Sequence, residues 1–398
     1  MSAILAPARR TVALGIDGLL DSDRHLVAGK RVGVVCNPAS IDAAFRHTAD
    51  RLARDPDVTV AALFGPQHGF RSDLQDNMIE TPHVNDARRQ VPIYSLYSET
   101  REPTAEMLRG LDVLVIDLQD GGTRVYTYVY TMANCLRAAA RHGVPVVVCD
   151  RPNPIGGDAV EGNLLQPQYA SFVGQFPIPL RHGMTIGEIA RLFNEEFGIG
   201  ASLHVVPLEG WQRSMYHDET GLPWIIPSPN IPTLDSAIVY PGAVLFEGTR
   251  LSEGRGTTRP FELIGAPWID GDRLADAMNA RGLPGVFFRP VFFEPTFQKH
   301  ARETCGGCQL HVRDRAAFRP VRTAVELMAE FRRQDPARYA WREPPYEYEA
   351  DKQPIDILYG SDRLRTTLDA GGDVAALVAS WAPDEEAFKR TRNKYLMY

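Results

Sequence analysis

Polar clusters follow four apolar runs of this sequence. The runs span residues 58–64, 113–117, 144–149 and 176–180, and the clusters after them contain carboxylates, amides, imidazoles and guanidinium groups. Such side chains bind hydroxyl-rich or anionic small molecules and exchange protons with them. Ligands of an open α/β sheet bind outside the carboxyl ends of its strands. We therefore expect the four clusters to share one site.

Aspartates at the strand ends are the first candidates for acid–base chemistry. Asp117 ends one apolar run, Asp120 lies in the turn beyond it, and Asp150 ends the next run. An unpaired buried charge is costly, and Arg124 and Arg151 are near enough in sequence to pair with these carboxylates. A structural Asp–Arg network is therefore the alternative to catalysis, and for Asp150 we favour the network.

Four further carboxylates, Glu80, Glu161, Glu247 and Glu253, lie in loops that face no predicted core. Any two of them brought together would serve as acid and base. One of them alone is more often a solvated side chain.

Histidine, arginine and tyrosine side chains are candidate substrate contacts. His68 and His182 each follow a predicted strand beside a glycine, where the imidazole either contacts substrate or bonds loop backbone. Arg181 precedes a helix N-terminus, which favours anions. Tyr126 and Tyr128 offer aromatic faces that suit a sugar ring bearing a charged group; ordinary packing at a helix start is the alternative.

The apolar runs alternate with helical patterns in the first part of the chain. Continuous apolar strands that alternate with helices indicate a parallel sheet covered on both faces. The strands are expected at 31–36, 58–64, 91–97, 113–117, 144–149 and 203–207, and the helices at 42–54, 104–111, 128–142 and 185–197. A polar loop is expected between residues 71 and 90.

The pattern changes after a stretch rich in proline and glycine, residues 221–261, which we interpret as a hinge and as part of the wall of the site. Beyond it, helices are expected near 271–281, 320–333, 361–370 and 384–395, and strands at 286–293 and 309–312. The predicted fold class is α/β. A Rossmann-like, mostly parallel sheet occupies residues 1–255, and a smaller C-terminal α+β domain occupies 256–398, with the site in the cleft between them.

The composition is that of a globular enzyme. The chain has 398 residues, of which 44% are hydrophobic and 23% charged, and its net charge is -7. This charge does not favour nucleic acid or an anionic membrane, and no apolar run approaches the length of a membrane span. Two domains are expected from the length, a homo-oligomer stays open, and the low cysteine count fits a reducing cytoplasm.

Several cofactor and nucleophile motifs are absent from the sequence. It contains no G-x-G-x-x-G after Gly121-Gly122, no phosphate loop, no G-x-S-x-G and no H-E-x-x-H. Cys305-Gly306-Gly307-Cys308 lacks a second cysteine pair for zinc, and a tight turn into a strand is the simpler interpretation. We expect no cofactor and no metal.

The residues quoted above also occur in motifs that resemble a bacterial family of exo-acting β-N-acetylmuramidases, formerly a family of unknown function. The matching segments include Gly65-Pro66-Gln67-His68-Gly69-Phe70, Ile93-Tyr94-Ser95-Leu96-Tyr97, Asp112-Val113-Leu114-Val115-Ile116-Asp117-Leu118-Gln119-Asp120, Arg124-Val125-Tyr126-Thr127-Tyr128, Asp150-Arg151-Pro152-Asn153-Pro154, Arg181-His182-Gly183-Met184-Thr185, Pro227-Ser228-Pro229-Asn230, Leu245-Phe246-Glu247-Gly248-Thr249 and Gly254-Arg255-Gly256-Thr257. They span most of the chain in the family's order.

This resemblance implies a Rossmann-like domain with a smaller C-terminal domain. It also implies hydrolysis that releases N-acetylmuramic acid from the non-reducing end of muropeptide-type glycans, in peptidoglycan recycling. Many relatives carry glutamate where this chain has Gln67, and an amide cannot act as acid or nucleophile. Glu80 follows closely and is the predicted replacement.

The resemblance also suggests roles for individual side chains. N-acetylmuramic acid carries a lactyl carboxylate, for which arginine is the natural partner; the candidates are Arg124, Arg181 and Arg255. Asn153 and Asn230 are the candidates for its acetamido group.

The predicted catalytic carboxylates are Glu80, Asp117 and Asp120. The predicted substrate contacts are Gln67, His68, Arg124, Tyr126, Tyr128, Asp150, Asn153, Arg181, His182, Asn230, Glu247 and Arg255. The alternatives are a glycosidase for a different sugar, a non-catalytic muropeptide-binding protein in which Gln67 marks lost catalysis, and a metal-dependent hydrolase.

Overall fold

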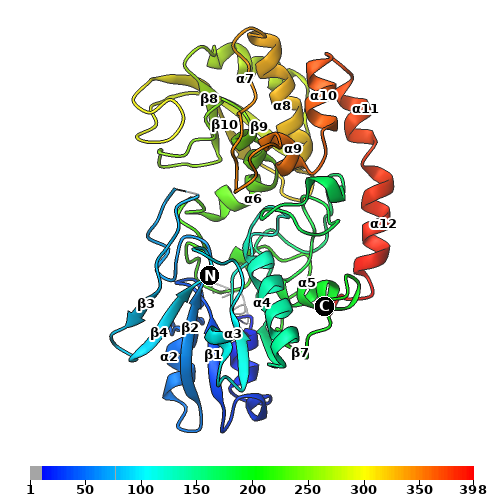
Figure 1. The fold of residues 1–398 in the computed structure, drawn as a ribbon. Coiled ribbons are helices and arrows are strands. Elements are labelled where there is room, and N and C mark those ends of the chain that lie inside the picture. Colours follow the sequence, from blue (N-terminus) through cyan, green and yellow to red (C-terminus); the bar gives the residue numbers. More distant parts are fainter. Residues whose placement is uncertain (1–10, 77) are drawn as a thin grey trace, which may run out of the picture.

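The computed structural model describes residues 11–76 and 78–398, and its larger part is built on a seven-stranded sheet (Figure 1). The strand order is β3-β4-β2-β1-β5-β6-β7, and all pairs are parallel except β3 with β4. The strands are β1 (Arg31–Val35), β2 (Thr59–Gly65), β3 (Val84–Asp86), β4 (Val91–Ser95), β5 (Val113–Ile116), β6 (Val146–Cys149) and β7 (Leu203–Val206). The direction of strand order reverses between β1 and β5, and such a switch point opens a crevice at the carboxyl ends.

Helices cover both faces of this sheet. Successive side chains of a strand point to opposite faces, so Leu114 and Ile116 join one hydrophobic cluster while Val113 and Val115 join another. The first cluster contains α3 (Ala105–Leu108), α4 (Tyr128–His142) and α5 (Ile186–Glu195), and the second contains α1 (Gly15–Leu19) and α2 (Thr48–Arg54). The apolar runs of the sequence are therefore continuous because both faces are buried.

Local signals set the ends of the two long helices on the first face. Gly143 follows α4 in the left-handed conformation, with φ of 69°, as helix C-termini favour. Thr185 Oγ1 accepts from the Glu188 N–H at 3.2 Å, and Glu188 Oε2 accepts from the Thr185 N–H at 3.0 Å. This capping box begins α5.

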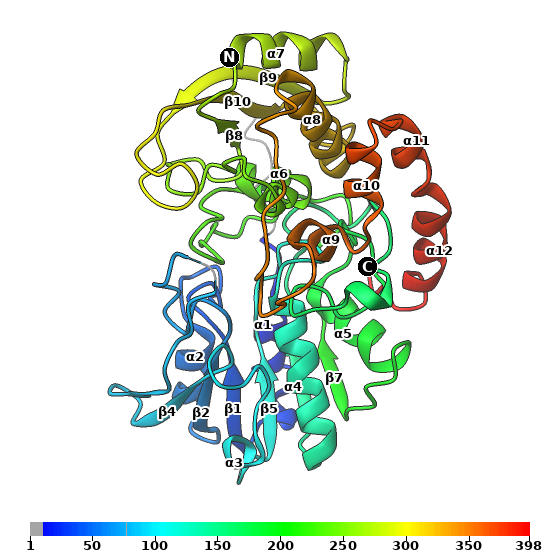
Figure 2. The ribbon, with the colours of Figure 1, turned by 45° about the horizontal axis from the view of Figure 1, so that its top comes forward.

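The second part of the molecule contains a three-stranded antiparallel sheet in the order β8-β10-β9 (Figure 2). Its elements are α6 (Leu234–Ala243), β8 (Leu263–Ala266), α7 (Gly271–Ala280), β9 (Val286–Phe293), β10 (Cys305–Val312) and α8 (Pro320–Gln334). A side chain at Gly307 would place its Cβ 2.1 Å from the Ile264 carbonyl oxygen, so this strand pairing requires glycine there.

Four C-terminal helices follow, of which the last three run from the second domain along the side of the molecule back toward the large sheet (Figures 1 and 2). They are α9 (Pro354–Tyr359), α10 (Arg363–Asp369), α11 (Val374–Ala379) and α12 (Ala382–Arg392). The terminal Tyr398 hydroxyl donates to Asp150 Oδ2 at 2.7 Å, and Arg392 Nη1 donates to the Gly157 and Gly183 carbonyls at 2.9 and 2.7 Å. The chain end therefore ties the two parts together.

Short 3-10 helices complete the fold: η1 (Arg24–Leu26), η2 (Pro167–Tyr169), η3 (His217–Glu219) and η4 (Val244–Gly248). The predicted fold class, with a parallel sheet and a smaller α+β domain, is confirmed. The division at residue 255 stays a prediction. Across residues 11–76 and 78–398, no helix is both long and apolar enough to cross a membrane.

Several predicted elements are wrong in detail. Residues 176–180 form no strand, because they enter the core as an irregular segment and only Arg181 makes isolated bridges, to Thr123 and Glu161. Cys305 to Cys308 lie inside β10 rather than in a tight turn. The predicted helix 42–54 begins only at Thr48, and the predicted hinge contains α6 and η4.

Candidate active site

A polar cavity lies between the carboxyl ends of the large sheet and the second domain. The cavity and the open solvent at its mouth together take up about 520 Å³. Its wall comes from the loop after β2, the start of α4, the segment before α6, the η4 region and the loop before α9. The lining residues are Gln67, His68, Val125, Tyr126, Thr127, Tyr128, Val173, Ser228, Asn230, Ile231, Tyr240, Val244, Glu247, Arg255, Phe261, Tyr346, Glu347 and Leu358.

Glu247 is held in this cavity as a carboxylate. Arg255 Nη2 donates to Glu247 Oε1 at 2.6 Å, and the Tyr346 hydroxyl donates to Oε2 at 2.8 Å. Burial favours the neutral form, but the charge and hydrogen bond of Arg255 and the hydrogen bond of Tyr346 outweigh it, so the pKa of Glu247 lies below its usual value. Glu247 is therefore ionised at neutral pH.

Glu347, in contrast to Glu247, has a pKa above its usual value. Burial is the main cause that raises the pKa of Glu347 to about 7, and the nearby charge of Glu247 adds to it, against hydrogen bonds from Tyr97 and Gln67. The Tyr97 hydroxyl donates to Glu347 Oε2 at 2.9 Å. Glu347 thus carries a proton in a substantial fraction of molecules at neutral pH. Its backbone is in the left-handed region, with φ of 44°, a conformation that non-glycine residues adopt rarely.

Gln67 positions Glu347. The Thr127 hydroxyl donates to Gln67 Oε1 at 2.7 Å, which leaves the amide nitrogen as the group that donates to the Glu347 carboxyl. An amide gives Glu347 a hydrogen bond without a second negative charge. Gln67 is therefore compatible with an acid at position 347.

His68 is a neutral imidazole at the cavity wall. Its Nδ1 lies 2.7 Å from the Leu74 carbonyl oxygen, and since a carbonyl only accepts, Nδ1 carries the hydrogen. Burial lowers the pKa of His68 to about 4. Its Nε2 is therefore left as a hydrogen-bond acceptor.

Asn230 and Arg255 each present an unused polar atom. Asn230 Nδ2 donates to the Gln75 carbonyl at 2.7 Å, while its Oδ1 is buried and has no partner among the described residues. Arg255 Nη1 is likewise buried without a partner in the part of the chain that the structure describes. A buried polar atom without a partner is costly, so a ligand that supplies a donor to Asn230 and an acceptor to Arg255 would bind favourably.

Tyrosine rings complete the apolar part of the wall. Tyr126 packs edge-to-face against Tyr128 and Tyr240, with centroid distances of 4.9 and 5.9 Å. The Tyr128 hydroxyl donates to the Pro227 carbonyl at 2.8 Å and accepts from Asn37 Nδ2 at 3.0 Å. Tyr128 therefore fixes the segment that carries Asn230.

Seven of the predicted site residues line this cavity: Gln67, His68, Tyr126, Tyr128, Asn230, Glu247 and Arg255. The expected convergence of Glu80, Asp117, Asp120 and Arg124 on one cavity is wrong, because none of the four lines it. Half of the Glu80 side chain is exposed, and its Oε1 pairs with Arg101 Nη2 at 3.1 Å. A catalytic role for Glu80 stays an untested prediction, and its position argues against it.

Asp117 and Asp150 satisfy structural hydrogen bonds below the cavity. Asp117 accepts from Arg151, through both Nε and Nη2, and from the Thr48 hydroxyl. Among the described residues no arginine side chain bonds Asp150, contrary to the predicted Asp–Arg network, and Asp150 accepts instead from Thr185 Oγ1 and the Gly187 N–H, both at 2.7 Å. Burial raises the pKa of Asp150 to about 7.

Arg124, Arg181 and Asn153 are also structural. Arg124 Nη1 donates at 2.9 Å to the Asn163 and Ile178 carbonyls, and its Nη2 donates to two carbonyls of α9. Arg181 Nη2 donates to the Ile155 carbonyl at 2.6 Å. Asn153 closes a turn, because its Oδ1 accepts from the Ile155 N–H at 3.1 Å. Guanidinium groups committed to carbonyls in this way are not anion sites.

Asp120 and His182 form a buried pair behind the tyrosine wall. Asp120 Oδ2 accepts from the Gly122 N–H at 2.8 Å and lies 3.2 Å from His182 Nε2. After burial, the charge of Asp120 is among the causes that raise the pKa of Tyr126 and Tyr240. The predicted catalytic role of Asp120 and the substrate contact of His182 stay predictions.

The sequence interpretation missed Glu347, Tyr346 and Tyr97 as site residues. The alternation of aromatic and acidic residues from Tyr346 to Glu349, after two prolines, was the available signal. Within residues 11–76 and 78–398, no group of three or more His, Cys, Asp or Glu side chains is placed to hold a metal ion.

A cavity between two domains that raises the pKa of one carboxyl and lowers that of another suits acid-assisted hydrolysis of a glycosidic bond. Family models agree with this chemistry. The model of the N-terminal domain of exo-beta-N-acetylmuramidase NamZ matches residues 32–235, and that of its C-terminal domain matches residues 238–398. The chain belongs to the exo-β-N-acetylmuramidase NamZ family, as the resemblance predicted.

Individual relatives cover nearly the whole chain. The peptidoglycan beta-N-acetylmuramidase NamZ of Bacillus subtilis (strain 168) is 46% identical over 387 residues, which are 97% of this chain and 91% of the relative. Two crystal structures of DUF1343 family proteins from Bacteroides fragilis NCTC 9343 are also similar. One has a TM-score of 0.89 and 37% identity, covering 98% of this chain and 100% of its own. The other has a TM-score of 0.76 and 28% identity, covering 98% and 99%.

Proposed function

We propose that this chain hydrolyses the β-glycosidic bond of a non-reducing terminal N-acetylmuramic acid in peptidoglycan-derived glycans. The observation that carries the proposal is the pair of buried carboxyl groups with opposite pKa changes in one cavity. The pKa of Glu347 is raised to about 7, whereas that of Glu247 is lowered. The family and its Bacillus subtilis member support the choice of substrate.

Glu347 acts as the general acid in this proposal. Cleavage of a glycosidic bond requires a proton on the leaving oxygen as the bond breaks. Because it is buried, the Glu347 carboxyl carries a proton in a substantial fraction of molecules at neutral pH, and Tyr97 and Gln67 hold it in place. Once the proton has left, the same two hydrogen bonds stabilise the carboxylate.

Glu247 acts as the ionised partner. Positive charge develops at the anomeric carbon in the oxocarbenium-like transition state, and a carboxylate fixed by Arg255 and Tyr346 stabilises it without rearrangement. Asn230 Oδ1 accepts the acetamido N–H, and Arg255 Nη1 donates to a sugar oxygen. These contacts would use the two buried atoms that otherwise have no partner among the described residues.

The test is incubation with the disaccharide of N-acetylmuramic acid β-1,4-linked to N-acetylglucosamine, with products identified by mass spectrometry. We expect both free monosaccharides, and no cleavage of the disaccharide with the two sugars in the reverse order. An intact N-acetylmuramyl disaccharide would contradict the proposal. If the intact disaccharide also binds tightly, the chain is a muropeptide-binding protein, the alternative that Gln67 raises.

We also propose a cytoplasmic role in peptidoglycan recycling. All five cysteines are free and buried, at positions 36, 135, 149, 305 and 308, which fits a reducing compartment. Cell fractionation tests this, and recovery of the protein from the periplasm or the medium would contradict it.

A further inference from the structure

Arg255, which lines the cavity, and Lys299, which shares Glu253 with it, are already matched by carboxylates. Arg255 contacts Glu247 at 2.6 Å and Glu253 at 3.3 Å, and Lys299 Nζ donates to Glu253 at 2.7 Å. Two positive charges thus face two negative charges. The lactyl carboxylate of N-acetylmuramic acid brings one more negative charge, and in a partly desolvated site it needs a cation of its own.

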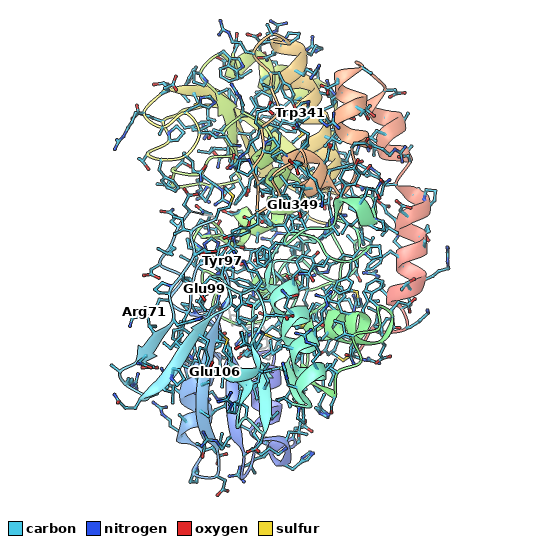
Figure 3. All side chains as sticks on the ribbon, in the orientation of Figure 1. Arg71, Tyr97, Glu99, Glu106, Trp341 and Glu349 are labelled. Atoms are coloured by element: carbon cyan, nitrogen blue, oxygen red, sulfur yellow. The ribbon has the colours of Figure 1, made fainter. Side chains whose placement is uncertain are left out.

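Arg101 lies one tyrosine ring away from the general acid. The guanidinium carbon of Arg101 is 4.5 Å from the centroid of the Tyr97 ring and 4.2 Å from that of Tyr348. The Tyr97 hydroxyl reaches Glu347 Oε2 at 2.9 Å. Figure 3 places Tyr97 at the boundary between the large sheet and the second domain, below Glu349.

The two rings hold the guanidinium in a fixed orientation through cation–π contacts. Its Nη1 donates to the Ser98 carbonyl, and its Nε is buried without a partner in residues 11–76 and 78–398. About a fifth of the Arg101 side chain is exposed, at 21%, and the neighbouring Tyr348 is 53% exposed. Arg101 is therefore rigid and still accessible.

The counter-ion of Arg101 is a replaceable one. Its Nη2 lies 3.1 Å from Glu80 Oε1, and the Glu80 side chain is half exposed. The segment that carries Glu80 lies against the general acid, because the Glu347 N–H donates to Met78 Sδ at 3.3 Å. An exposed ion pair contributes little to stability. A carboxylate of the substrate therefore displaces Glu80 from Arg101 at a low cost in free energy.

We propose that Arg101 binds the lactyl carboxylate of the terminal N-acetylmuramic acid, and that Glu80 is the anion which Arg101 releases when this sugar binds. The inference rests on the proposed substrate. It makes Arg101 the residue that distinguishes N-acetylmuramic acid from N-acetylglucosamine, and it gives Glu80 a role in substrate exchange rather than in proton transfer.

The test compares two chromogenic N-acetylmuramides, one with the free lactyl carboxylate and one with its methyl ester. For Arg101→Gln we expect kcat/KM for the free acid to fall about tenfold or more, as for the loss of a charge-assisted hydrogen bond, while the ester is cleaved as by the wild type. For Glu80→Gln we expect a lower KM for the acid alone. Arg88→Gln is the matched control, because Arg88 is a largely exposed arginine whose partner Asp50 lies 3.8 Å away.

An equal loss on both substrates in Arg101→Gln would show a purely structural role and overturn the inference, and so would an unchanged preference for the acid. Binding of free N-acetylmuramic acid, measured by calorimetry, separates this inference from the proposed function. Wild-type binding that Arg101→Gln abolishes would support the inference even if no substrate were hydrolysed. Hydrolysis of the disaccharide with undiminished acid preference in Arg101→Gln would overturn only the inference.

Discussion

Replacement of Glu347 by glutamine removes the proposed acid while keeping the size of the side chain and one acceptor oxygen. Loss of a positioned proton donor typically lowers kcat by about 10²–10⁴-fold. We expect that loss for the disaccharide, whose leaving oxygen needs the proton, and a much smaller loss for an aryl glycoside with a good leaving group. Glu349→Gln is the matched control, because Glu349 is two residues away and pairs with Lys352 at 3.1 Å outside the cavity.

The pH dependence of kcat follows from the Glu347 carboxyl as well. Because the proton of Glu347 is required, wild-type kcat falls as the pH rises through about 7. The residual activity of Glu347→Gln has no such alkaline limb, since its amide does not titrate. A wild-type profile that stays flat from pH 6 to 9, or a variant that keeps the alkaline limb, would refute the assignment.

The raised pKa of Glu347 also predicts a stability change. A rise from the usual 4.5 to about 7 means that the folded state binds this proton more tightly than the unfolded state. The contribution of this group to the free energy of unfolding is therefore greatest below pH 4.5. It falls by about 3 kcal/mol as the pH rises from 4.5 through 7. Glu347→Gln removes that loss, so we expect its urea midpoint at pH 8 to exceed that of the wild type. An equal or lower midpoint would contradict the buried, neutral carboxyl.

Two other substitutions test the surroundings of the two carboxyl groups, and a third tests the structural role of Arg124. Tyr346→Phe removes a hydrogen bond to Glu247 and raises its pKa, so the acidic limb of the kcat profile moves to higher pH; an unmoved limb would count against an ionised Glu247. Gln67→Glu places a second carboxylate beside Glu347 and raises its pKa further, so the alkaline limb moves up by about one pH unit, and a downward shift would contradict the reasoning. Arg124→Met leaves the buried carbonyls of Asn163, Ile178 and Leu358 without this donor, while that of Tyr359 keeps its hydrogen bond from Asn163 Nδ2, and it costs about 3 kcal/mol in urea denaturation; an unchanged midpoint would contradict the structural role of Arg124.

The sheet was predictable because its strands are buried on both faces. Val113 to Ile116 and Val146 to Cys149 are apolar without interruption, and their alternation with helices leaves few other arrangements. The same signal failed at 176–180, because an apolar segment that crosses the core in irregular form has the same composition as a strand. It failed again at Cys305, because two glycines suggest a turn unless the close approach of Ile264 is known.

Part of the site was predictable for a similar reason. Gln67 and His68 follow a strand end, and Glu247, in η4, and Arg255, in the loop beyond it, lie in the stretch predicted to form part of the wall of the site. The sequence does not show which charged side chains, distant along the chain, pair with one another in the fold. Asp117 follows an apolar strand, as a catalytic aspartate often does. Only its contacts with Arg151 in the folded chain show that its role is structural.

Glu347 could not be assigned from its own neighbours in sequence. Its raised pKa depends on burial beneath Tyr97 and on the charge of Glu247, and these residues meet only in the folded chain. Arg124 shows the converse, since its position after a glycine turn suggests a ligand contact, whereas its donors hold α9 to the large domain.

Direct titration of Glu347 tests the central claim, that the cavity holds a protonated acid beside an ionised partner. The protein labelled with ¹³C at the glutamate side-chain carboxyl carbons would be followed by NMR from pH 4 to 9, and the Glu347 signal identified by its absence in Glu347→Gln. We expect the Glu347 carboxyl to titrate near pH 7. The Glu247 signal should already be that of a carboxylate when Glu347 loses its proton. Titration of Glu347 near the usual glutamate value of 4.5 would contradict the account.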